Sequence, residues 1–165
     1  MCALSPAGFW STGNDSLAPA AAKVHKIAAM SRLSGPVAPL IFKSATVRRV
    51  SFRYLNTACH GNRLPAAQAV ELVKDVVACT VTNEVLSTEE EQIAPLDPVP
   101  CPITLAWSEK DSLFPVATYG QVAREHLPQA TFKLLPDVNH VPMIDDPDLV
   151  ARTILTVTGA EVPQR

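Results

Sequence analysis

The hydrophobic pattern changes its period near the middle of the chain. Through about residues 11–99, apolar side chains recur three or four positions apart, whereas beyond residue 100 short apolar runs alternate with helical stretches. A spacing near 3.6 places side chains on one face of a helix, and a short continuous run is typical of a buried strand. The sequence therefore predicts a strand remnant at 1–10, a helical segment at 11–99 and an α/β segment at 100–165.

The helical segment is predicted to hold three main helices. The first ends at Gly35, the second runs from Pro39 towards Leu55, and the third opens at Pro65. Proline suits the first turn of a helix, where its missing N–H is not needed, and glycine is typical of the residue just past the end. A proline-rich stretch at 97–102 then separates this segment from the next, because its three prolines forbid helix continuation.

The last segment predicts strand, helix, strand and helix in that order. Strands are expected at 103–107 and 130–135, a helix at 115–127, and a second helix that starts at Asp146-Pro147. This alternation is the signature of a parallel α/β unit. Because both apolar runs are nearly continuous, we expect both strands to be buried on two faces. The fold class is therefore α/β, with parallel strands flanked by helices.

Length and composition indicate one globular domain. The chain has 165 residues, of which 47% are hydrophobic and 18% charged, with a formal net charge of −2. With no basic stripe, the sequence argues against a nucleic-acid partner. No uninterrupted apolar run approaches the roughly 18 to 20 residues of a membrane span, and no signal peptide is recognisable.

The cysteines indicate a reducing compartment. Four are present, none in a Cys-x-x-Cys pair and none with a histidine at metal-ligand spacing. We therefore expect free thiols, no metal and a cytoplasmic location, although the sequence leaves a Cys79–Cys101 bridge open.

Two polar residues follow the two strands of the α/β segment. Asp111 comes shortly after the first strand and His140 shortly after the second. Neighbouring parallel strands end at the same edge of a sheet, so these residues are expected to lie close together. A carboxylate that accepts the imidazole N–H fixes the tautomer and leaves the other ring nitrogen as a general base. Asp137 and Asp15 are rival carboxylates, while Asp145 and Asp146 are interpreted as helix caps.

Three segments resemble the α/β-hydrolase superfamily. Residues 102–115, which contain Trp-Ser-Glu-Lys-Asp, are similar to its acid segment, and residues 134–147, which contain Asn-His-Val-Pro-Met-Ile-Asp-Asp-Pro, are similar to its histidine segment. Residues 4–9 resemble the end of the strand that precedes its helical lid. Ser108 and Asn139 stand where the family commonly has glycine. Asparagine tolerates the left-handed backbone better than most residues, so we expect the turn before His140 to survive.

The resemblance implies a site and an activity. Asp111 and His140 would be catalytic, residues 11–99 would form a helical lid over a pocket, and Phe9, Trp10 and Val141 would contact the substrate. Phe9 and Trp10 are equally well explained as core residues. The implied reaction is hydrolysis of a small acyl-type substrate at an ester, thioester or C–C bond, with no metal or organic cofactor.

The nucleophile of that family does not occur in this sequence. No Gly-x-Ser-x-Gly turn is present, and the resemblance implies that the nucleophile and oxyanion segments belong upstream of residue 1. His60-Gly61 has the same two residues as the family's oxyanion His-Gly pair, but it does not follow a predicted strand. We therefore expect the C-terminal part of a hydrolase, inactive alone, that pairs with an N-terminal half or with its own copies. Two alternatives stay open: a non-catalytic module that binds a ligand or a partner, and the product of a mis-set start codon or disrupted gene.

Overall fold

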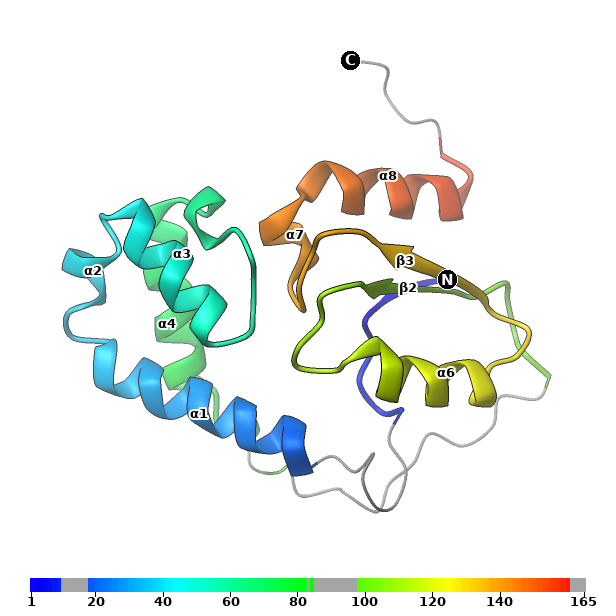
Figure 1. The fold of residues 1–165 in the computed structure, drawn as a ribbon, viewed down its shortest axis with the longest axis horizontal. Coiled ribbons are helices and arrows are strands. Elements are labelled where there is room, and N and C mark those ends of the chain that lie inside the picture. The colour runs from blue at the N-terminus through cyan, green and yellow to red at the C-terminus, as the bar shows by residue number, and fades with distance from the viewer. Residues whose placement is uncertain (10–17, 83, 85–97, 161–165) are drawn as a thin grey trace.

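The computed structural model describes residues 1–9, 18–82, 84 and 98–160. It contains a small parallel sheet with helices packed against it and, beside it, a group of helices from the first half of the chain (Figure 1). The sheet consists of β1 (Cys2–Leu4), β2 (Thr104–Ser108) and β3 (Thr131–Leu135). The predicted strands are present, and the α/β class is confirmed.

The three strands are parallel and lie in the order β1-β2-β3. Leu4 of β1 lies opposite Ala106 of β2, and Ala106 lies opposite Lys133 of β3. Strand β2 is central and its last four residues are buried, as the sequence predicts. The same prediction is wrong for β3, where Leu134 is 46% exposed. Among the described strands β3 pairs only with β2, so it forms an edge of the sheet. Three of its five residues are exposed.

Helices pack on the two faces of the sheet (Figure 1). Because side chains alternate along a strand, Leu105 and Trp107 of β2 belong to a core with α6 (Gln121–His126), whereas Ala106 joins a second core with Leu149 of α8 (Pro147–Thr158). The second core therefore ties α8 to the sheet.

The helix predicted at 115–127 has two parts. A π-helical turn, η2 (Val116–Gly120), precedes α6. A Cβ at Gly120 would come within 2.8 Å of the Val116 side chain, so glycine permits this close turn. Helix α8 follows the prediction: the Asp146 carboxylate accepts a hydrogen bond from the Leu149 amide at 2.8 Å, and Gly159 ends the helix with φ 73°.

The helical part comprises α1 (Ala18–Ser34), α2 (Ala38–Ile41), α3 (Ala45–Tyr54) and α4 (Ala66–Ala78), with the short η1 (Gly61–Arg63) before α4. The single helix predicted from Pro39 to Leu55 is wrong, because the chain breaks at Ser44. Ser44 has an extended backbone with ψ 121°, and its hydroxyl accepts a hydrogen bond from the Val47 amide at 3.4 Å. The buried Arg48 guanidinium donates to the carbonyls of Phe42 and Lys43 beside the break. These bonds satisfy the carbonyls that the interruption frees.

Three negative findings apply to the described part of the chain. No helix in it is long and apolar enough to cross a membrane. No group of three or more histidine, cysteine, aspartate or glutamate side chains in it is placed to hold a metal ion. The four cysteines are all free thiols.

Candidate active site

The loops that follow β2 and β3 are hydrogen-bonded to each other beyond the end of the sheet. The Glu109 amide donates to the Leu135 carbonyl at 2.9 Å, and the Lys110 amide donates to the Val138 carbonyl at 3.0 Å. Parallel pairing thus continues for a few residues after the strands end. This continuation places the residues that follow, Asp111 and His140, side by side.

Asp111 and His140 form a direct hydrogen bond. Nδ1 of His140 lies 3.0 Å from Oδ2 of Asp111, whose side chain is fully buried, while that of His140 is 22% exposed. The other carboxylate oxygen accepts the backbone amides of Leu113 and Phe114 at 2.9 and 2.8 Å. A carboxylate only accepts hydrogen bonds, so Nδ1 carries the ring hydrogen and Nε2 remains the basic nitrogen. Nε2 has no hydrogen-bond partner within the described ranges.

A buried tryptophan holds the loop that carries the acid. The Trp107 side chain is completely buried, and its Nε1–H donates to the Phe114 carbonyl at 2.9 Å. The Phe114 ring then packs edge-on against the His140 ring, with 5.3 Å between centroids. The tryptophan therefore supports the aromatic surface against which the imidazole rests.

Asn139 connects the two loops through its side chain. Its Oδ1 accepts hydrogen bonds from the Ser112 amide at 3.1 Å, the Ser112 hydroxyl at 3.2 Å and the His140 amide at 2.8 Å. Asn139 does not use the left-handed backbone that asparagine tolerates, since the residue of this loop with positive φ is Asp137, at 60°. The asparagine is needed here for its amide oxygen, a role that glycine could not fill.

Asp145 is not the cap residue that the sequence suggests. Its carboxylate is 1% exposed and accepts three backbone amides: those of Cys59 at 3.0 Å, His60 at 2.6 Å and Asn139 at 2.8 Å. Two of these amides belong to the helical part, and the third precedes the histidine of the pair. A further bond, from the Val141 amide to the Thr57 carbonyl at 2.9 Å, joins the same two segments. Asp145 thus joins the helical part to the loop that carries His140, residues 136–141, which we call the histidine loop.

The rival carboxylates do not reach the imidazole. Asp137 is largely exposed and pairs with Lys110 at 2.6 Å. That hydrogen bond, followed by the attraction of the opposite charge, lowers the pKa of Asp137 and raises the pKa of Lys110. Asp15 lies outside the described residues. His60-Gly61 sits in the loop beside Asp145, and a Cβ at Gly61 would come within 2.7 Å of the Phe52 side chain, so this glycine allows close packing on α3.

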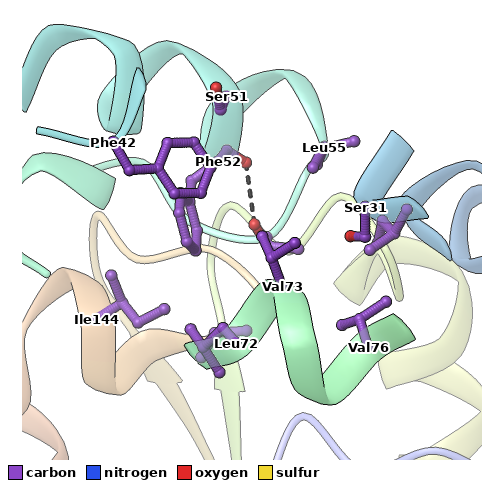
Figure 2. A pocket seen from close by; sticks show the side chains of 12 residues that line it. Ser31, Phe42, Ser51, Phe52, Leu55, Leu72, Val73, Val76 and Ile144 are labelled. Atoms are coloured by element: carbon purple, nitrogen blue, oxygen red, sulfur yellow. Dashed lines mark hydrogen bonds between the residues drawn. The ribbon is translucent and has the colours of Figure 1, made fainter. Parts of the chain in front are cut away.

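An apolar pocket of about 200 Å³ opens between the helical part and the histidine loop. Figure 2 shows side chains of the helices around it directed towards a common space, with Ile144 on the side of the histidine loop. Val141, the residue after His140, also lines the pocket. The three residues that the resemblance implies as substrate contacts therefore have different outcomes. Phe9 is 4% exposed in the core against His126, as the core alternative expects, and Trp10 lies outside the described residues.

Solved structures have a similar fold. An α/β hydrolase, MGS-M2, from a Medee basin deep-sea metagenome library matches 100% of this chain with a TM-score of 0.59 and 15% sequence identity. A thermophilic esterase from Thermogutta terrifontis, solved with malate bound, matches 96% of it with a TM-score of 0.51 and 17% identity. The chain carries part of the α/β-hydrolase fold.

The similarity is found in the structures and not in the sequence, and it extends over only part of each matched chain. The 165-residue chain covers 57% of the length of the first of those structures and 54% of the second. No protein-family model matches its sequence, and no curated protein matches it either. At identities of 15% and 17%, the likeness establishes the fold and leaves the activity to be argued from the site.

Proposed function

We propose that this chain supplies the acid and the base of an α/β-hydrolase-type enzyme that cleaves an ester of a small acyl compound. The observation that carries the proposal is the 3.0 Å bond between Nδ1 of His140 and the buried Asp111 carboxylate. A thermophilic esterase among the structures with this fold favours esters over the thioesters and C–C bonds that the family resemblance also includes.

In the proposed reaction His140 moves the proton. Nε2 takes the hydrogen of a nucleophilic hydroxyl as it attacks the ester carbonyl, and the imidazolium then gives that proton to the leaving alkoxide. Asp111 keeps Nδ1 protonated and stabilises the positive ring between these steps. The amides of Leu113 and Phe114 hold the carboxylate in place during both transfers.

The helical part would act as a lid that binds the acyl group. The apolar pocket is lined mostly by aliphatic and aromatic side chains, and Val141 links it to the base. A volume of about 200 Å³ suits a short hydrocarbon chain rather than a polymer. The hydrogen bonds that the Asp145 carboxylate accepts from both segments would hold the pocket at a fixed position relative to His140.

The nucleophile and the oxyanion donors would come from residues outside these 165 or from another chain. Among the described strands, β1 pairs with β2 on one side only, so its other edge can accept an additional strand. Three residues of an edge strand, Cys2 to Leu4, are half-buried and largely apolar, which suits a strand that continues a sheet.

The histidine–aspartate pair can be tested directly by nitrogen NMR of the imidazole. We expect the wild-type chain to show His140 in the Nδ1–H tautomer, because the Asp111 carboxylate accepts that hydrogen. Asp111→Ala should shift His140 towards the Nε2–H tautomer, while His25, an exposed histidine of α1, stays unchanged as an internal control. An Nε2–H tautomer in the wild type would contradict the proposed base.

The origin of the nucleophile can be tested by an esterase assay. We expect the purified 165-residue chain to hydrolyse p-nitrophenyl acetate no faster than His140→Ala does, because a general base without its hydroxyl nucleophile gives little acceleration. Turnover by the wild type that His140→Ala abolishes would place the nucleophile within this chain and overturn that part of the proposal.

A further inference from the structure

A second pocket lies on the polar side of the junction between the helical part and the two loops. Its volume is about 480 Å³, and it is separate from the apolar pocket, with which it shares no lining residue. The residues around it come from α3, the loop after α3 and the two loops that hold the pair: Arg49, Arg53, Asn56, Cys59, His60, Lys110, Ser112 and Asn139. We name it the polar pocket.

The polar pocket carries an excess of positive charge. Arg49 and Arg53 lie four positions apart on α3, hence on the same face, and Lys110 faces them from the loop after β2. No aspartate or glutamate lines the pocket. Within the part of the chain that the structure describes, the guanidinium groups of Arg49 and Arg53 form no hydrogen bond or ion pair.

Two carboxylates, Asp137 and Asp145, contact residues of the pocket without lining it. The exposed Asp137 carboxylate pairs with Lys110 at 2.6 Å and balances part of its charge, which leaves Arg49 and Arg53 as the cations without a carboxylate partner among the described residues. Asp145 lies behind the pocket, with its oxygens occupied by three backbone amides. Burial and then Asp145 raise the pKa of the Cys59 thiol, whereas Lys110 and Arg53 oppose that rise. The positive charges of Lys110 and Arg53, which belong to different segments, therefore both act on the space around the Cys59 thiol.

From this arrangement we infer that the polar pocket binds a small organic polyanion through its phosphate or carboxylate oxygens. Two guanidinium groups on one helical face offer paired N–H donors that match such oxygens, and Lys110 adds a third cation. Ser112, Asn139 and Asn56 supply neutral polar groups for the rest of the ligand. A concave space of this volume fits a small molecule better than a nucleic-acid or protein surface.

The inferred site adjoins the acid–base pair without including it. Lys110 and Ser112 flank Asp111 in sequence, and Asn139 precedes His140. A ligand in the polar pocket would therefore contact both loops at once and restrain them relative to each other. The inference concerns binding alone and stands whether or not the chain takes part in hydrolysis.

Calorimetry on the 165-residue chain tests the site, with pyrophosphate and citrate as probes and acetate as a singly charged control. We expect one saturable site for at least one polyanion and no measurable binding of acetate. Arg53→Ala and Arg49→Ala should each weaken binding about tenfold or more, since each removes charge-assisted hydrogen bonds. Arg152→Ala on α8, an exposed residue outside the pocket, makes the same change in net charge and should leave the affinity unchanged.

The two probes also identify the ligand chemistry. Preference for pyrophosphate indicates a phosphorylated ligand, and preference for citrate indicates a polycarboxylate. Amide NMR shifts on titration should be centred on Cys59, Lys110, Ser112 and Asn139. Equal weakening by Arg152→Ala and Arg53→Ala, shifts centred elsewhere, or no saturable binding of either polyanion would overturn the inference.

Discussion

Asp145→Ala is expected to lower the free energy of unfolding by roughly 3–5 kcal/mol, as measured by urea denaturation. The carboxylate is buried and accepts the amides of Cys59, His60 and Asn139. Alanine leaves a buried amide, that of Asn139, and two part-buried amides, those of Cys59 and His60, without their acceptor. Each unsatisfied buried group costs about 1–3 kcal/mol, less whatever water entering the space recovers. The loss should also loosen the contact between the helical part and the histidine loop.

The adjacent aspartate provides a matched control. Asp146 has the same side chain, but it accepts one amide, that of Leu149 at the start of α8. Asp146→Ala should therefore cost only about 1 kcal/mol, the usual value of a helix cap. If the two substitutions lowered the free energy of unfolding equally, the three hydrogen bonds that Asp145 accepts would not contribute the extra stability expected of them.

The sequence predicts the α/β part well because its signals are local. Apolar runs followed by Asp111 and by His140 indicate parallel strands with reactive residues at their ends, and the structure brings those two residues to 3.0 Å. Their catalytic role stays a prediction. Asp146-Pro147 and Gly159 mark the ends of α8 through cap chemistry that depends only on neighbouring residues.

Features that depend on distant partners could not be predicted in the same way. The function of Asp145 arises from amides at Cys59 and His60, more than eighty positions earlier in the chain. The exposure of β3 depends on its place at the edge of the sheet rather than on its apolar sequence. The break at Ser44 did have a local signal, since serine is a preferred N-cap residue and its hydroxyl here accepts the Val47 amide.

Trp107→Phe is the second substitution for which a large effect is expected. Phenylalanine keeps most of the buried aromatic surface but removes the Nε1–H that the Phe114 carbonyl accepts at 2.9 Å. A buried carbonyl without its donor costs about 1–3 kcal/mol, and Trp107→Ala, which also leaves a cavity, should cost at least about 3–5 kcal/mol. Urea unfolding of the two variants measures both losses.

The same substitution should also change the environment of His140. Because the Phe114 ring packs against the imidazole at 5.3 Å, releasing its carbonyl should shift or broaden the Nδ1–H proton resonance of His140. Phe132→Leu is the matched control, since Phe132 stacks on Trp107 at 6.1 Å but takes no part in the hydrogen bond from Trp107 to the Phe114 carbonyl. It should reduce stability and leave that resonance in place. If Trp107→Phe lost stability with the His140 resonance unaltered, the tryptophan would be part of the core alone and not a support of the acid–base pair.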